Sequence, residues 1–231
     1  MKKKVILLLS VLSFLPGINT NAFTPSGGVS LPEVTIVSNG KTYASISSYM
    51  AKHVRYPEGT ESFGLIGTTV VEFTVSTSGT LSNFNVINSI SSAIDEEVIR
   101  VLESTNGKWR PGIRNGQTIE MKREVSVVFK PNQNYDLAAI AQKSQIKADE
   151  KLLDDNDPKR AERFYTRAIS LLPYEQGFLA ARGLSRYEQG DVNGAKEDWE
   201  RIVYLNEYNP AVFKFSSSQL NPLTKKLPGY S

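Results

Sequence analysis

The sequence predicts an α+β domain, with a small antiparallel sheet and two helices, followed by an all-α region of helical repeats. Two observations indicate this division. Between residues 67 and 129, segments of alternating apolar and polar residues are separated by glycine-containing turns, which is typical of half-buried strands. Between residues 134 and 208, apolar residues recur at helical spacing, and the pattern repeats after 34 residues.

The first two long strands form a predicted hairpin. In residues 69–75 the odd positions Val71, Phe73 and Val75 face one way, while Glu72 and Thr74 face the other, so that one face packs on a core. The dipeptide Ser78-Gly79 then provides the turn chemistry that leads into a second strand at residues 81–87. We therefore expect these two strands to lie side by side in an antiparallel sheet.

Two helices are predicted to accompany this sheet. The first covers residues 44–54 and ends before Tyr56-Pro57, because a residue that precedes proline disfavours the helical conformation. The second begins at an N-cap in Ser91-Ser92 and carries an apolar stripe to residue 102. Its first turn holds the acids of residues 95–97, where the helix dipole favours negative charge.

A long closing strand is predicted at residues 119–129. Its alternation gives it one packed face and one solvated face. The packed face would hold Ile119, Met121, Arg123, Val125, Val127 and Phe129, and the open face Glu120, Lys122, Glu124 and Ser126.

The second half of the chain pairs with itself when it is shifted by 34 residues. The matched pairs are Asp157 with Asp191, Ala161 with Ala195, Tyr165 with Trp199, Ala168 with Ile202, and Leu171 with Leu205. This period and these residue types are similar to the tetratricopeptide repeat. The first copy fits less well, since Asp149 and Asn156 stand where glycines are usual. Two repeats are fewer than such arrays need, so we expect these helices to lean on the first domain or on another chain.

The N-terminus has the features of a secretory leader. Three lysines precede an apolar run at residues 5–15, and small residues follow up to Ala22. The run is shorter than a membrane-spanning helix, so we expect cleavage after about residue 22 and a periplasmic chain. The alternative is retention of the run as a short inner-membrane anchor. Removing residues 1–22 changes the balance of 27 basic and 24 acidic residues to 24 of each.

The composition argues against catalytic, metal and nucleic-acid sites. His53 is the only histidine and cysteine is absent, so neither a zinc site nor a nucleophile with its base can be assembled. The glycines are too scattered for a phosphate loop, and no block of Lys and Arg predicts nucleic-acid binding. Asp157 before Pro158 is typical of a helix cap rather than a calcium ligand. We expect no enzyme, no cofactor and no metal.

The first domain resembles the C-terminal domain of TonB-family proteins. The resemblance rests on features in one order: Tyr56-Pro57, Gly67, the strand with Val71 and Phe73, Gly79, the helix of residues 95–102, Trp109-Arg110-Pro111-Gly112, and Val127 to Phe129. It implies docking of an extended segment of an outer-membrane receptor by strand addition along residues 119–129. The partner-binding residues it implies are Tyr56, Pro57, Glu120, Lys122, Glu124, Ser126 and Val128. A proline at Val127 is the substitution expected to test this docking.

The chain also departs from that family. An energy-transducing member keeps a membrane helix and a long Pro-rich spacer, whereas only about twenty residues, reaching on the order of 70 Å, separate the apolar run from this domain. We therefore predict a periplasmic docking protein linked to transmembrane transport, with a tetratricopeptide scaffold that has no role in energy transduction as the alternative. Self-pairing of the edge strand in a homodimer stays open. The predicted parts are a leader at 1–22, a linker with a short strand at 23–40, the docking domain at 41–131, the repeats at 134–208 and a loosely ordered tail at 209–231.

Overall fold

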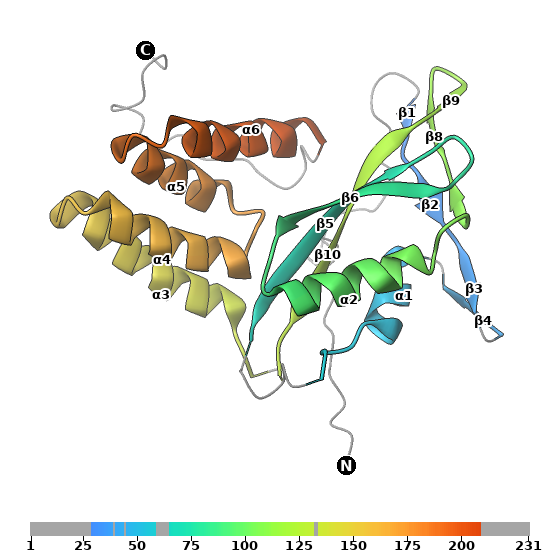
Figure 1. The fold of residues 1–231 in the computed structure, drawn as a ribbon, viewed down its shortest axis with the longest axis horizontal. Helices are drawn as coiled ribbons and strands as arrows, with labels where there is room; N and C mark the ends of the chain where they lie inside the picture. The colour runs from blue at the N-terminus through green and yellow to red at the C-terminus, as the bar shows by residue number, and fades with distance from the viewer. Residues whose placement is uncertain (1–28, 39, 44, 59–64, 132–133, 209–231) are drawn as a thin grey trace, which may run out of the picture. The chain divides into compact units, whose positions relative to one another are not determined.

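A computed structural model describes residues 29–38, 40–43, 45–58, 65–131 and 134–208 of the chain. These residues fall into two compact units, with the boundary between Tyr135 and Asp136. The first unit is a mixed α/β structure with small antiparallel sheets, and the second is helical (Figure 1). The predicted leader at 1–22 and the predicted tail at 209–231 lie outside the described residues.

The largest sheet of the first unit has three strands in the order β10-β5-β6. The central strand β5 (Gly67–Val75) pairs along its full length with β10 (Met121–Phe129), in antiparallel register. On its other side it pairs with β6 (Leu81–Asn88), where the register shifts near Asn83, a residue with positive φ. The hairpin predicted at residues 69–75 and 81–87 is confirmed.

Two helices pack their apolar faces on this sheet. The helices are α1 (Ile46–His53) and α2 (Ser92–Glu103), and the hydroxyl of Ser91 caps α2 by accepting from the backbone N–H of Ile94. The core that they share with the sheet includes Met50, Ile94, Val98, Leu102, Val71 and Phe73. Burial of these side chains, at about 25 cal/mol per Å² of apolar surface, is the main stabilising term of this unit.

The closing strand is not continuous, and its second face is not uniformly wet. Glu120 interrupts the predicted strand, so that Ile119 belongs to β9 (Gln117–Ile119), which pairs with β8 (Gly112–Arg114). On the predicted open face of β10, Val128 is buried and Ser126 is half-buried. The polar positions of β5 are buried as well, because this central strand is covered on both of its faces.

Residues 29–38 form part of the first unit, although the sequence predicts a linker with one short strand there. Strand β1 (Val29–Ser30) pairs with β8, and β2 (Glu33–Val34) pairs with β7 (Trp109–Arg110). A further hairpin joins β3 (Ile36–Ser38) to β4 (Lys41–Tyr43). The side chains of Val34 and Ile36 enter the core. The folded part of the first unit therefore begins before residue 41.

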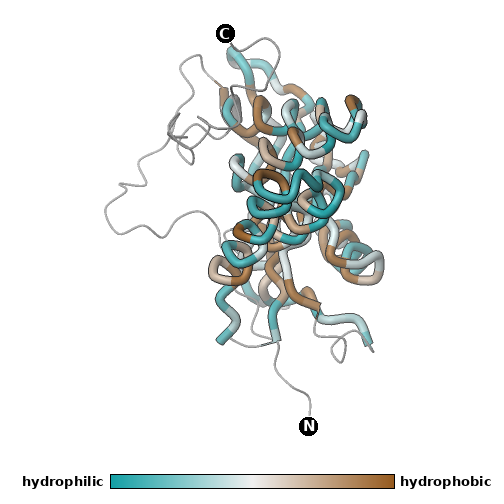
Figure 2. Tube along the Cα trace, turned by 90° about the vertical axis from the view of Figure 1, so that its left-hand side faces the viewer, coloured by the Kyte–Doolittle hydropathy of each residue, from teal (hydrophilic) through white to brown (hydrophobic). Residues whose placement is uncertain are grey.

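The second unit consists of helices that each pack on the next. They are α3 (Leu137–Asp149), continued by the π-helical turn η2 (Glu150–Asp154), then α4 (Pro158–Leu171), α5 (Gln176–Glu188) and α6 (Val192–Tyr208). Figure 2, which faces this unit, shows apolar and polar residues alternating around the helices. This alternation is what allows each helix to bury one side against its neighbour.

The turns before α4 and α6 have matching geometry. Asp157 caps α4 by accepting from the N–H of Arg160 at 3.0 Å, as its place before Pro158 predicts. Asp191, 34 residues later, accepts from the N–H of Gly194 at 2.9 Å. The residues just before these caps, Asn156 and Gly190, both have positive φ, of 51° and 82°. The sequence period thus corresponds to a repeated turn.

Candidate functional site

The candidate site is the outer edge of β10. Within the described part of the chain, β10 lies at the end of its sheet, and no strand pairs with it on the side away from β5. An edge strand directs a row of backbone N–H and C=O groups away from its sheet, where another strand can pair with them. The residues of β10 whose backbone groups lie on that side are therefore the ones that an added strand would contact.

Two hydrogen bonds fix the orientation of the backbone in the neighbouring strand β5. The carbonyl of Thr68 accepts from the side-chain amide of Asn88 on β6. Just past the end of β5, the N–H of Ser76 donates to the carbonyl of Thr80 at 2.9 Å, also on the β6 side. Since successive residues of a strand direct their backbone groups to opposite edges, the even-numbered positions of β5 face β6 and the odd-numbered positions face β10.

The register carries this alternation over to β10. Val127 lies opposite Thr69, an odd position, so its backbone groups point inward to β5. Ser126 and Val128 lie opposite Val70 and Thr68, so their backbone groups point to the outer edge. The same parity places the backbone groups of positions 122 and 124 outward. Val127 is therefore the wrong position for the proline test, because its N–H belongs to the ladder with β5.

The side chains along this edge change in character from one end to the other. Glu120 is exposed between β9 and β10. Lys122 keeps a side chain that is 63% exposed while its amine lies 2.9 Å from the carboxylate of Glu72. Glu124 and Ser126 are half-buried, and Val128 is only 6% exposed. The side chains are thus charged and exposed at the start of β10 and become progressively buried toward its end.

Tyr56 supports the far end of the strand. The ring of Tyr56 packs edge-to-face on Phe129, with 5.3 Å between ring centroids. Its hydroxyl donates to the carbonyl of Leu65 at 3.0 Å, and the residue is 7% exposed. Pro57 is half-buried. These positions make Tyr56 a residue that holds the loop against β10, and they leave little of its surface for a partner.

The only histidine has a structural position. The ring of His53 stacks on Tyr49 with 4.0 Å between centroids, and its Nδ1 lies 2.8 Å from the carbonyl of Tyr49. Tyr43 closes the cluster by meeting both rings edge-on. These contacts pack α1 on β4.

A buried carboxylate, which the sequence analysis placed among the first-turn acids of α2, joins the sheet to that helix. Asp95 is 7% exposed and accepts hydrogen bonds from the hydroxyls of Thr69, at 3.1 Å, and Ser89. Burial raises the pKa of Asp95 above its usual value, although these hydrogen bonds oppose the shift. In the sequence, the position of Asp95 next to Ile94 of the apolar stripe is the feature that indicates its burial.

The first unit is a small α+β domain. Its main sheet has three antiparallel strands, with β10 at one edge and two helices on one face. Residues 52–131 match the family model for the Gram-negative bacterial TonB protein C-terminal domain. The match begins within α1 and ends just after β10, and it does not reach the helical unit. No curated protein matches the chain.

The helices of both units lack the dimensions or the composition of a membrane span. In the ranges that the structure describes, each helix is too short or too polar to cross a bilayer.

Proposed function

We propose that the first unit docks an extended segment of an outer-membrane transporter by strand addition on β10, as part of transport across the bacterial envelope. The observation that supports this most strongly is the outer edge of β10, within a region that matches the TonB C-terminal domain. A docked segment would hydrogen-bond to the outward backbone groups of Ser126 and Val128. Its side chains would alternate between the two faces of the enlarged sheet.

The change from exposed charged side chains to buried apolar ones along β10 favours a segment that is polar at one end and apolar at the other. Lys122 and Glu120 lie at the open end, where charged side chains of the partner stay hydrated. At the other end, the buried Val128 favours small or apolar partner side chains. Each backbone hydrogen bond adds a net ~0.5–1.5 kcal/mol, so several bonds together with this selectivity give useful affinity.

The helical unit favours a second function, that of a scaffold. The caps at Asp157 and Asp191 and the left-handed turns before them recur with the period of the sequence. This repeated geometry supports a tetratricopeptide-type array, a class that holds protein partners. In this alternative the first unit is structural or dimerises through β10, the helices carry the partner, and energy transduction has no part.

In-cell photocrosslinking separates the two functions, because it captures whichever protein lies against the labelled position. A benzophenone amino acid is introduced at Lys122, on the docking edge, and in a second strain at Lys143, an exposed lysine on α3. Docking at β10 predicts crosslinks from position 122 to a short segment of an outer-membrane transporter, with none from position 143. Transporter crosslinks from position 143 alone would reject docking at the edge and support the scaffold.

The proposed location is the periplasm, with the leader removed. The apolar run at residues 5–15 supports export, and its length supports cleavage over anchoring. The intact mass of the protein from each envelope fraction tests this. A mass that begins near Phe23 in the soluble periplasmic fraction supports the proposal. A full-length mass in the membrane fraction replaces it with an anchored protein that remains coupled to the inner membrane.

A further inference from the structure

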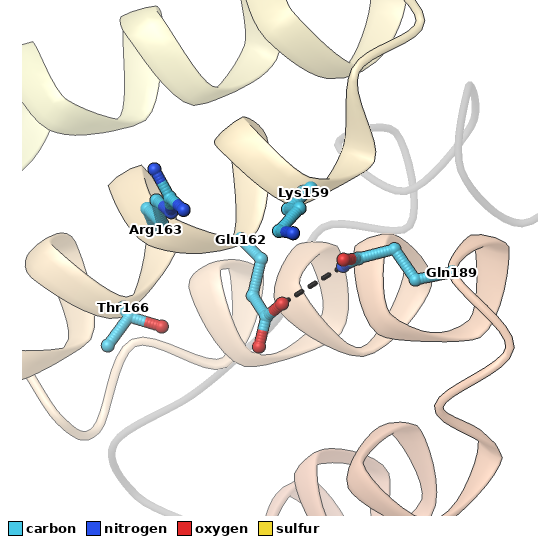
Figure 3. Close-up of a pocket in the computed structure, with 5 residues that line it drawn as sticks. All are labelled: Lys159, Glu162, Arg163, Thr166 and Gln189. Carbon is cyan, nitrogen blue, oxygen red and sulfur yellow. Dashed lines mark hydrogen bonds between the residues drawn. The ribbon is translucent and has the colours of Figure 1, made fainter.

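The helical unit contains a polar hollow on the surface of α4. It has a volume of about 340 Å³ and is lined by Lys159, Glu162, Arg163, Thr166 and Gln189. Figure 3 shows that four of these side chains project from α4 and that Gln189, at the end of α5, is hydrogen-bonded to Glu162. No apolar side chain lines the hollow, so its ligand is recognised through charge and hydrogen bonds.

Two cations in this hollow have no partner of their own. Lys159 and Arg163 are exposed, and neither makes a hydrogen bond or ion pair within the described part of the chain. They are four residues apart on one helix, which puts their Cβ atoms about 5–6 Å apart on the same face. The hollow therefore presents two positively charged side chains that start from neighbouring positions on one face of α4.

The one acid in the hollow is ionised and already paired with Arg186 and Gln189. The carboxylate of Glu162 accepts from Arg186 at 3.0 Å and from Gln189 at 2.9 Å. Burial opposes ionisation, but these hydrogen bonds and the charge of Arg186 hold the pKa of Glu162 below its usual value. Glu162 thus remains ionised and bound to α5, and it leaves Lys159 and Arg163 without a local counter-ion.

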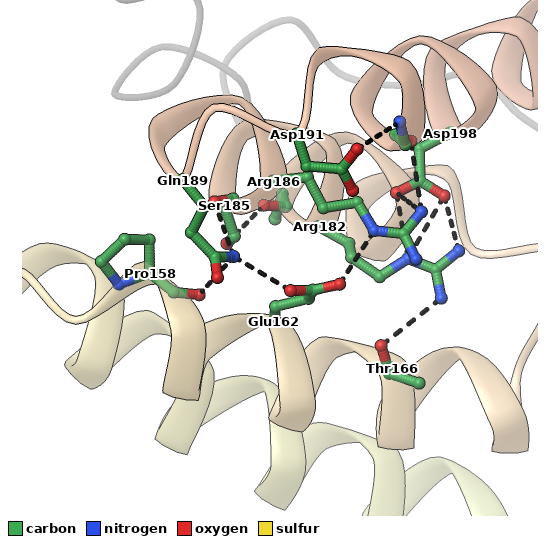
Figure 4. Close-up of polar contacts among 11 residues, drawn as sticks. Pro158, Glu162, Thr166, Arg182, Ser185, Arg186, Gln189, Asp191 and Asp198 are labelled. Carbon is green, nitrogen blue, oxygen red and sulfur yellow. Dashed lines mark hydrogen bonds and ion pairs between the residues drawn. The ribbon is translucent and has the colours of Figure 1, made fainter.

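A buried ion network holds this arrangement in place. Asp198 on α6 is 2% exposed, pairs with Arg182, and accepts from Arg186 at 3.1 Å. Arg186 therefore links Glu162 on α4 to Asp198 on α6, as Figure 4 shows. Because the network spans three helices, Glu162 has a fixed position and the surface around the two cations is preformed.

We propose that this surface binds an extended acidic peptide in which two carboxylates alternate, in the pattern Asp/Glu-x-Asp/Glu. Side chains two residues apart in an extended chain lie about 6.6 Å apart on one side. That spacing is close to the about 5–6 Å between the Cβ positions of Lys159 and Arg163, and their long side chains can adjust to the remaining difference. The hydroxyl of Thr166 and the side-chain carbonyl oxygen of Gln189 lie at the same hollow, where they can bind the peptide backbone. This inference is independent of strand addition at β10.

A single compact anion fits this surface less well. Phosphate requires donors that converge on one point, whereas Lys159 and Arg163 stand one helical turn apart on α4. The absence of apolar lining residues likewise disfavours insertion into a lipid surface. An extended peptide uses both cations at once.

The test measures binding of a fluorescent nonapeptide, with two alternating glutamates in a Gly/Ser background, to the full chain by anisotropy at low salt. The double variant Lys159→Glu and Arg163→Glu is expected to weaken binding at least ~tenfold. Each exposed ion pair with the peptide is weak by itself, but the double variant turns both attractions into repulsions. Lys143→Glu on α3 makes the same kind of charge change away from the hollow and is expected to leave affinity within ~twofold.

Three results would overturn the proposal: no difference between the double variant and the wild type, an equal loss with Lys143→Glu, or equal binding of a peptide with glutamines in place of the glutamates. Competition by inorganic phosphate at a concentration that matches the peptide, or preferential binding to anionic vesicles, would replace the peptide with those ligands. Circular dichroism of each variant shows that the helices remain folded. Screening by 0.5 M salt should abolish the specific binding.

Discussion

The phenol of Tyr165 on α4 donates a hydrogen bond to Asp149 at the end of α3, with 2.5 Å between the two oxygens. The residues 34 positions later, Trp199 and Gly183, are also neighbours: a Cβ added to Gly183 would lie 2.5 Å from the indole nitrogen of Trp199. In both helix pairs the aromatic ring of the later helix meets the same position of the earlier one. Where the ring is tryptophan, that position has no room for a side chain.

Gly183→Ala is expected to destabilise the helical unit despite the better helix propensity of alanine. The gain of about 1 kcal/mol from propensity is outweighed by overpacking against Trp199, which typically costs about 1–3 kcal/mol. Urea unfolding followed by circular dichroism measures the change. Trp199→Phe provides a smaller ring, so the double variant should recover much of the loss. A purely additive double variant would contradict the proposed clash.

Gly79→Ala is expected to cost more than Gly116→Ala. Both glycines have nearly the same positive φ, of 78° and 79°, so the strain of about 1–2 kcal/mol is common to the two substitutions. A Cβ at Gly79 would also overlap the carbonyl oxygen of Trp109, whereas at Gly116 it would meet nothing within 4 Å. The difference in unfolding free energy should therefore be at least about 1 kcal/mol. Equal losses would show that the close approach is easily relieved.

The pH dependence of the first unit should change when Asp95 is replaced by asparagine. Burial raises the pKa of Asp95 in the folded state, so the folded chain binds a proton more readily than the unfolded chain. Its stabilising contribution is complete below the unfolded pKa and is lost as the pH rises through the folded pKa. The wild type should therefore gain stability relative to Asp95→Asn as the pH falls from 7 to 4.

The two tryptophans allow this to be measured in one unit at a time. Trp109 lies in the first unit and Trp199 in the second, so a Trp199→Phe background reports the first unit by fluorescence. Urea titrations at several pH values then give the difference in unfolding free energy between chains with and without the Asp95→Asn substitution. A difference that stays constant with pH, or that grows toward neutral pH in favour of Asp95, would contradict the assigned shift.

Local features of the fold were predictable from the sequence, and long-range ones were not. The cap at Ser91 and the start of α4 at Asp157-Pro158 depend on neighbouring residues, and both occur as predicted. The two short strands at residues 29–34 depend instead on pairing with residues 109–114, which no local pattern records. The interruption at Glu120 has the same origin, because Ile119 pairs with Gly112 in another sheet.

The candidate edge shows the same limit. Alternation identified Lys122, Glu124 and Ser126 as one side-chain set, and the register shows that their backbone groups also share the outer edge. Val127 is the wrong position for a proline because its N–H points to β5. The sequence does not tell the inner side of an edge strand from its outer side, whereas the hydrogen bonds of Thr68 and Ser76 do. Tyr56 is a predicted partner-binding residue, and the structure shows that its ring is buried against Phe129.

The measurement that tests strand addition most directly is the affinity of the crosslinked transporter segment for Ser126→Pro, with Ser126→Ala as the matched control. Proline removes an outward N–H without removing a bond to β5, so we expect at least ~tenfold weaker binding. In a Trp199→Phe background, Trp109 fluorescence should show that the unit stays folded, and Ser126→Ala should bind within ~twofold of the wild type. Unchanged affinity of a folded Ser126→Pro chain would contradict docking at this edge.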